Sequence, residues 1–224
     1  GGSPVIPPNS RSTVPSPGRL GLVEASAPTN LSLLGWTDED STELLWSLSR
    51  SPDADLALRT LARLAEDLGD GWSELDTRLR TDKSLRGRMF ALAGSSSALG
   101  DHLVSEPDKW RLLTTCTDSL PTADALRESM LASVGAVQET GDDALEQVFR
   151  AELTGPKAII ALRTAYRDHL MILAAADLAA TVENEPVVPY EVVGRHLSDL
   201  ADAALTAALS VAVTVTFPDG PCSV

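Results

Sequence analysis

Apolar residues recur at three- and four-residue spacing along most of the chain, and the alternating pattern of a half-buried strand is almost absent. The segment 52–68 is the clearest case, because one helical face carries its apolar residues (Ala57, Leu61, Leu64 and Leu68). The preceding Ser51-Pro52-Asp53 combines an N-cap hydroxyl, a first-turn proline and a carboxylate, and Gly69 predicts the stop. The pattern predicts an all-α protein, folded as an irregular multi-helix bundle.

Further helix starts follow in close succession. Thr37 with Asp40 predicts a helix that ends near Arg50, Asp82 predicts an N-cap, and Ser95 or Ser96 predicts another. Ser105-Glu106-Pro107 predicts the start of the next helix. Two long segments, 156–181 and 188–214, are separated by helix-breaking prolines and predict an antiparallel helix pair.

Composition divides the chain into four predicted regions. Six of the fourteen prolines fall by residue 28, among serines and glycines, so residues 1–30 are expected to form a disordered arm. A short-helix subdomain is expected over 31–154, and the long helix pair over 155–217. Residues 218–224 then form a loop or tail.

Charge and hydropathy narrow the classes of partner. The formal net charge of −14 and the lack of any Lys/Arg-rich block argue against binding to a nucleic-acid backbone. The longest uncharged run, 203–217, is shorter than the roughly 20 residues that span a bilayer. No N-terminal segment has the pattern of a secretory signal. A cytoplasmic protein with no membrane partner is therefore expected.

The residue types that carry catalysis or bind metals are scattered. Cys116 and Cys222 match no metal-ligand spacing, which favours free thiols, and the three histidines (His102, His169 and His196) form no paired motif with carboxylates. The glycine- and serine-rich segment 94–100 has no lysine and no preceding strand, so it predicts a helix–helix joint.

For the remaining charged residues, the sequence context favours structural roles over catalytic ones. Asp53-Ala54-Asp55 lies in a first helical turn, where carboxylates complement the helix dipole. Arg167-Asp168-His169 occupies a helix centre, where neighbours point in different directions. Asp177 interrupts an alanine-rich run and is expected to form a structural ion pair with an arginine (Arg163, Arg167 or Arg195). No catalytic, cofactor-binding or metal-binding residue is predicted.

Several stretches resemble actinobacterial glutamine synthetase adenylyltransferases. They are PGRLGL at 17–22, LWSLSRSPDAD at 45–55, SLRGR at 84–88, LAGSSSALGDHL at 92–103, LRTAYRDH at 162–169, ADLAATVE at 176–183 and LSDLADAA at 197–204. As the resemblance implies, the full enzyme has two nucleotidyltransferase halves. One transfers AMP from ATP to a tyrosine of glutamine synthetase, and the N-terminal half removes it by phosphorolysis.

The resemblance also implies that this chain lacks the family's catalytic motif. Catalysis in the family uses a glycine-rich strand-turn followed by a D-x-D pair that holds magnesium, and Asp53-Ala54-Asp55 has no such strand-turn before it. The chain is therefore expected to be a noncatalytic N-terminal fragment, inactive alone, with ATP and Mg²⁺ implied for the full-length enzyme. Glutamine synthetase and a nitrogen-signalling regulatory protein are the implied partners. The alternative is a free-standing acidic helical interaction module, with residues 1–30 as a tether.

Overall fold

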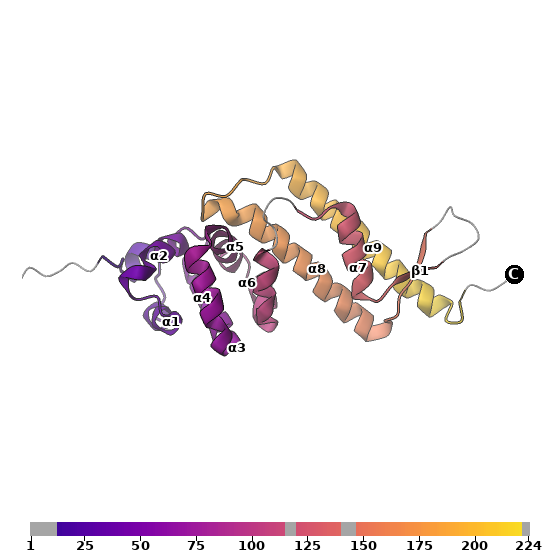
Figure 1. The fold of residues 1–224 in the computed structure, drawn as a ribbon, viewed down its shortest axis with the longest axis horizontal. Helices are drawn as coiled ribbons and strands as arrows, with labels where there is room; N and C mark the ends of the chain where they lie inside the picture. The colour runs from indigo at the N-terminus through magenta and orange to yellow at the C-terminus, as the bar shows by residue number, and fades with distance from the viewer. Residues whose placement is uncertain (1–12, 115–119, 140–146, 221–224) are drawn as a thin grey trace, which may run out of the picture. The chain divides into compact units, whose positions relative to one another are not determined.

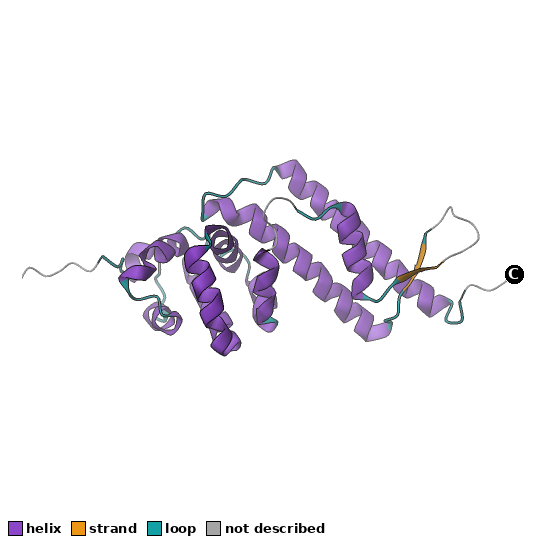
Figure 2. Ribbon diagram, viewed as in Figure 1, coloured by secondary structure: helices purple, strands orange, loops and turns teal. Residues whose placement is uncertain are grey.

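The computed structural model describes residues 13–114, 120–139 and 147–220. These residues are mostly helical, as predicted, and the described strands form a single two-stranded sheet (Figure 1, Figure 2). They divide into two compact units. Unit 1 runs up to Pro107 and also contains Thr181–Glu183, and unit 2 contains Asp108–Ala180 and the chain from Asn184 onward.

Unit 1 is built around a buried central helix. Every residue of α5 (Lys83–Ala93) from Leu85 to Ala93 is buried, and Phe90 lies with its ring centroid 5.8 Å from that of Trp36. Helix α5 packs with α2 (Thr42–Ser49), α3 (Ala54–Leu68), α4 (Trp72–Thr81) and α6 (Ser97–Ser105). The unit also contains η1 (Pro17–Leu20), α1 (Ala27–Leu34), η2 (Glu39–Ser41) and η3 (Gly69–Gly71).

Side-chain caps fix where these helices begin. Asp82 accepts a hydrogen bond from Leu85 N at 3.0 Å, and Ser96 accepts one from Leu99 N at 3.2 Å, so both predicted caps are confirmed. The cap of α3 is Asp53 rather than Ser51, because the Asp53 carboxylate reaches the free amide of Leu56. At the other end, Gly69 has φ 55°, a backbone region that glycine tolerates best.

The predicted arm of residues 1–30 extends too far along the chain. Residues 1–12 lie outside the described residues, but Pro17–Leu20 and Ala27–Leu34 are helical. Leu20, Leu22 and Ala27 are at most 4% exposed. The prolines do not prevent this order, because those at the first positions of η1 and α1 need no backbone N–H there.

Unit 2 contains two long helices that run antiparallel, as predicted. They are α8 (Gly155–Leu178), which continues into η5 (Ala179–Thr181), and α9 (Tyr190–Thr216) (Figure 1). Before them come η4 (Pro107–Thr114), α7 (Ala123–Ser133) and an antiparallel hairpin of β1 (Val137–Glu139) and β2 (Val148–Arg150), in which Val137 pairs with Arg150. Each strand has three residues, too few for the sequence pattern to show.

The division into units differs from the boundary expected near residue 154. Helix α7 shares one core with the long helices, in which Leu126, Met130 and Leu131 of α7 pack with Ala158 of α8 and Leu200 of α9. Burying the apolar face of α7 requires these partners, so this short helix belongs with the long pair rather than with the short helices of unit 1.

Candidate functional site

The carboxylates of Asp53-Ala54-Asp55 are engaged by the backbone. Asp53 caps α3, and Asp55, only 9% exposed, accepts hydrogen bonds from Val23 N at 3.0 Å and Glu24 N at 3.3 Å. The two carboxylates therefore fix the start of α3 and tie the segment before α1 to it. Because their oxygens satisfy amides at separate places, they do not fit a magnesium ion, and no step of a phosphoryl-transfer reaction follows from them.

The segment 94–100 is a joint between helices α5 and α6. A Cβ on Gly94 would stand 3.0 Å from Asp53 O and 3.1 Å from Phe90 O, and one on Gly100 would stand 3.1 Å from Thr60 Cγ2. The glycines thus allow close packing of α3, α5 and α6, and the serines supply the cap of α6. The prediction of a joint rather than a phosphate-binding loop agrees with this geometry.

Unit 2 contains two histidines with buried ring nitrogens: His196 is buried and His169 is half-buried. His169 Nε2 is 2.8 Å from Ser129 Oγ, while His169 Nδ1 and His196 Nε2 are buried without a hydrogen-bond partner in the described residues. Burial lowers the pKa of His169, which His196 lowers further and Asp168 opposes. Burial likewise lowers the pKa of His196, against the effect of Asp199. Both imidazoles therefore favour their neutral forms.

The serine–histidine contact does not form a catalytic triad. A triad needs a carboxylate on the second ring nitrogen of the histidine, and His169 Nδ1 has none in the described residues. The neighbouring Asp168 instead binds Lys109 Nζ at 2.8 Å. Arg167, Asp168 and His169 thus serve different contacts, as their adjacent positions on a helix predict.

Asp177 does not form the predicted ion pair. Its side chain is partly exposed on α8, and no arginine or lysine pairs with it among the described residues. Arg163, Arg167 and Arg195 are themselves exposed to solvent. Because Asp177 is only partly buried, its carboxylate retains access to water and needs no charged partner. Alanine-rich neighbours indicate close packing of part of the helix, which was an insufficient reason to expect Asp177 to be buried.

Cys116 and Cys222 lie outside the described residues. Within the residues that the structure describes, no group of three or more His, Cys, Asp and Glu side chains could hold a metal ion. One described helix, α9, is long and apolar enough to cross a membrane by length and composition. These two properties alone do not distinguish a membrane span from a packing helix.

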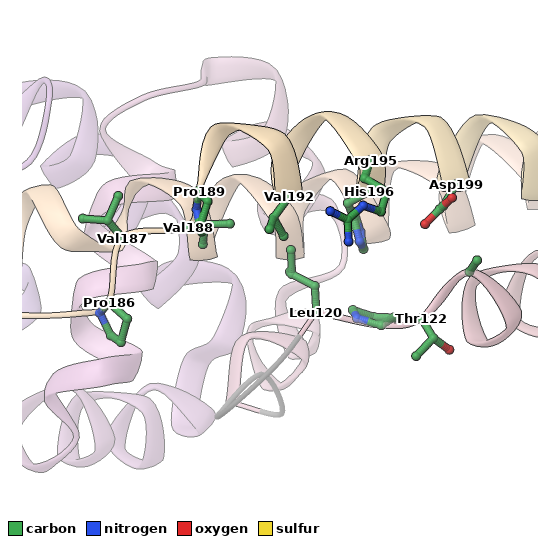
Figure 3. A pocket seen from close by; sticks show the side chains of 12 residues that line it. Leu120, Thr122, Pro186, Val187, Val188, Pro189, Val192, Arg195, His196 and Asp199 are labelled. Atoms are coloured by element: carbon green, nitrogen blue, oxygen red, sulfur yellow. The ribbon is translucent and has the colours of Figure 1, made fainter.

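An open cleft of about 530 Å³ lies between the first turns of α9, the linker 186–189 and the residues that lead into α7. Figure 3 shows Val192, His196 and Asp199 directed from α9 toward the segment that carries Leu120 and Thr122. The prolines of the linker, Pro186 and Pro189, hold it extended and start α9 at Tyr190. Sequence reasoning missed this cleft because residues 120–123 lie far along the chain from residues 186–199, which form the rest of it.

The cleft has the chemistry of a recognition site. Arg195 supplies a cation at its edge, Asp199 a carboxylate one turn further along α9, and valine and proline side chains an apolar wall. The one hydroxyl in its lining, from Thr122, accepts from Ala125 N at 3.2 Å as the cap of α7. The lining therefore lacks a free hydroxyl nucleophile with an aligned base, and its chemistry suits ligand binding better than catalysis.

A second polar cluster lies inside unit 1, where its described residues stabilise the fold and offer no reactive group. Arg86, 1% exposed, donates from Nε to Glu183 Oε1 at 2.9 Å, from Nη2 to Glu43 Oε1 at 3.0 Å and from Nη1 to Leu79 O at 3.2 Å. The Glu183 carboxylate also accepts from Ser47 Oγ. Lys83 and Arg86 hold the pKa of Glu43 below its usual value. Every Arg86 nitrogen is thus satisfied, as a buried guanidinium requires.

Together these features define a class: a mainly helical chain of two units, whose described polar clusters fix helix starts and stabilise packing. Comparison with known proteins shows the family. The chain is 59% identical over 220 residues to a bifunctional glutamine synthetase adenylyltransferase/adenylyl-removing enzyme of Nocardia farcinica, covering 98% of this chain and 22% of that enzyme. It is 53% identical over 213 residues to the enzyme of Mycolicibacterium smegmatis, covering 95% and 20% respectively.

A third relative, from Mycobacterium marinum and of the same name, is 50% identical over 209 residues, covering 92% of this chain and 20% of the enzyme. The chain belongs to this enzyme family, and it spans about a fifth of the length of the curated relatives it matches. No family model and no solved structure matches it. The family predicted from the sequence is thereby confirmed.

Proposed function

We propose that this chain is the noncatalytic helical N-terminal region of a bifunctional glutamine synthetase adenylyltransferase/adenylyl-removing enzyme. It flanks and supports the nucleotidyltransferase domain that removes AMP from glutamine synthetase. ATP and Mg²⁺ act in the rest of the enzyme, and glutamine synthetase is the protein on which the enzyme acts. A nitrogen-signalling regulatory protein is the second proposed partner, and the cytoplasm is the proposed compartment.

One observation supports the noncatalytic role most directly. The D-x-D in the family-like stretch 45–55 is Asp53-Ala54-Asp55, in which Asp53 caps a helix and Asp55 accepts hydrogen bonds from the amides of Val23 and Glu24. Nucleotidyl transfer needs carboxylates that converge on a metal ion. Because Asp53 and Asp55 bind backbone amides at separate places, this D-x-D supports a structural rather than a catalytic role for the stretch.

The proposal is tested by assaying two purified proteins side by side. One is the present chain, and the other is the same polypeptide continued as in its longer relatives. Transfer of labelled AMP from ATP to glutamine synthetase and phosphate-dependent release of AMP are both measured with Mg²⁺. We expect both activities in the longer protein and neither in the present chain. Magnesium-dependent turnover by the present chain would contradict the proposal.

Asp53→Asn in the longer protein tests the role of the D-x-D stretch. Asparagine caps helices about as well as aspartate but lacks the charge that a magnesium ligand needs. We expect the rate of AMP release to remain within about twofold of the unsubstituted enzyme, because a cap retained by Asn changes stability by only a few tenths of a kcal/mol. A loss of about a hundredfold, with the circular dichroism spectrum unchanged, would place Asp53 in the catalytic machinery.

A further inference from the structure

Helix α9 carries two apolar rows on opposite sides. One row, with Leu200, Ala203 and Ala207, is buried in the core that unit 2 builds from α7, α8 and α9. The other row lies about half a turn away and contains Ala201, Leu205, Ala208, Leu209 and Ala212. In this second row, Leu205 is 64% and Leu209 is 65% exposed. A helix with apolar residues on two sides is built to be covered on both.

The exposed row borders a groove between α8 and α9, which we call the α8–α9 groove. It encloses about 470 Å³, with Met130 of α7, Leu162 and Tyr166 of α8, and Leu205 and Ala208 of α9 in its lining. Ile159 and Ile160, 52% and 64% exposed, continue the apolar surface along α8. The alanines leave room for a further helix to approach α9 closely.

Charge is distributed unevenly around this groove. Arg163 and Arg167, one turn apart on α8, line it, and neither forms an ion pair or hydrogen bond among the described residues. The groove lining contains no carboxylate, although the whole chain has a formal net charge of −14. An occupant with an apolar stripe flanked by Asp or Glu would match both the groove and its cationic edge.

We propose that the α8–α9 groove holds an acidic amphipathic helix from the polypeptide that follows this region in the full-length enzyme. This inference rests on the proposed function. The chain covers only 20% to 22% of its relatives, so most of the enzyme is available as the occupant. The exposed apolar surface of α9 extends to Val215, which is 64% exposed, and Phe217, which is 48% exposed, close to where that polypeptide would continue. A tethered segment binds at high effective concentration.

The proposal is tested by cysteine accessibility in a background carrying Cys116→Ser and Cys222→Ser. Leu205→Cys is introduced into the present chain and into the full-length enzyme, and its rate of reaction with a maleimide is measured under native conditions. We expect labelling in the full-length enzyme to be at least about tenfold slower, equivalent to about 1.4 kcal/mol of protection. Leu33→Cys, at an apolar site on α1 that is 42% exposed, is the control and should label at similar rates in both proteins.

Charge reversal tests the proposed acidity of the occupant. Arg163→Glu with Arg167→Glu in the full-length Leu205→Cys enzyme should raise the labelling rate several-fold, because like charges would then face each other across the groove. Lys157→Glu makes the same kind of change on α8 outside the groove lining and should leave the rate unchanged. Equal rates in all three proteins would overturn the acidic character of the occupant.

Other occupants give different results. Protection that rises with the concentration of the present chain alone would identify a second copy, and protection that requires added glutamine synthetase would identify that protein. Protection that requires anionic phospholipid vesicles would identify a membrane surface. Each of these outcomes, like rapid labelling in the full-length enzyme, overturns the proposal. AMP release is measured on the same samples, so an active enzyme with a freely labelled groove refutes this inference and leaves the proposed function intact.

Discussion

At the scale of single residues, local contacts were predictable and distant ones were not. The caps Asp82 and Ser96 could be predicted because an N-cap bonds an amide three residues ahead. Arg86 meets Glu183 across 97 positions of sequence, and no local pattern indicates that partner. For Asp177 the prediction was wrong. Its apolar neighbours in sequence suggested a buried side chain, but the packing of α8 leaves that side chain partly exposed.

The Arg86–Glu183 pair leads to a stability prediction. Arg86→Met removes a guanidinium that is 1% exposed and leaves the Glu183 side chain, 9% exposed, without its closest cation. Among the described residues, Glu183 then keeps as its cation only the partly exposed Arg50, whose Nη2 is 3.6 Å from Glu183 Oε1. We expect the free energy of unfolding of unit 1 to fall by about 3 kcal/mol, the lower end of the cost of breaking a buried ion pair. Urea titration followed by tryptophan fluorescence measures this change.

The exposed pair of Arg63 and Asp101 provides the matched control for that experiment. Its side chains are 52% and 60% exposed, so Arg63→Ala should change the unfolding free energy by less than about 1 kcal/mol. Equal losses in the two variants would mean that the burial of Arg86 adds nothing to the strength of its ion pair.

At the scale of elements, long periodic helices were predicted well and short elements poorly. Helices α3, α8 and α9 follow from their apolar spacing, whereas the three-residue strands β1 and β2 are below the length at which alternation is visible. The candidate cleft and the α8–α9 groove could not be predicted at all. Both depend on which helices lie side by side. Apolar spacing indicates that one face of a helix is buried, but it does not indicate which other helix covers that face.

Two glycines in helical segments should respond to alanine in opposite directions. Gly94→Ala would bring a Cβ to 3.0 Å from the backbone oxygen of Asp53, and we expect a loss of about 1–3 kcal/mol from overpacking. Gly194→Ala lies on α9 with no atom within 4 Å of the new Cβ, so helix propensity should stabilise unit 2 by up to about 1 kcal/mol. Thermal unfolding monitored by circular dichroism distinguishes the two signs.

At the scale of the whole molecule, unit 2 should lose stability in mild acid. Burial lowers the pKa values of His169 and His196 in unit 2. As the pH falls below about 6.5, the ordinary histidine value, the unfolded chain takes up these protons before the folded unit does. The stabilisation from the neutral imidazoles is therefore complete above that pH and declines below it, toward the lowered folded-state pKa values.

Hydrogen exchange of α7, α8 and α9 between pH 7.5 and 5.5, corrected for intrinsic exchange rates, measures the decline. His169→Gln with His196→Gln should flatten it, because glutamine does not titrate. A decline of the same slope in the double variant would assign the acid sensitivity to other groups, the carboxylates among them.

A fragment experiment tests how unit 1 depends on Thr181–Glu183. A protein that ends at Pro107 keeps Arg86 but lacks Glu183, its closest carboxylate. Of the described carboxylates, only that of Glu43, whose side chain is 64% exposed, still pairs with Arg86 in that fragment. We therefore expect Arg86→Met to raise the urea midpoint there, because an apolar side chain costs less than an incompletely paired buried guanidinium. In the whole chain the same substitution should lower the midpoint, and a change of the same sign in both proteins would contradict this reasoning.

The placement of Thr181–Glu183 in unit 1, between two helices of unit 2, means that the chain passes from one unit to the other three times. A proteolytic cut after Pro107 leaves residues 1–107 attached only through their packing with Thr181–Glu183, whereas a cut on either side of that segment leaves the peptide connection between Pro107 and Asp108 intact. A nicked molecule should therefore migrate as two pieces in denaturing gels and still elute as one particle under native conditions. Unlike domains joined by a single linker, the two units separate after one cleavage only if Thr181–Glu183 also leaves unit 1 or the connection at Pro107 is cut as well.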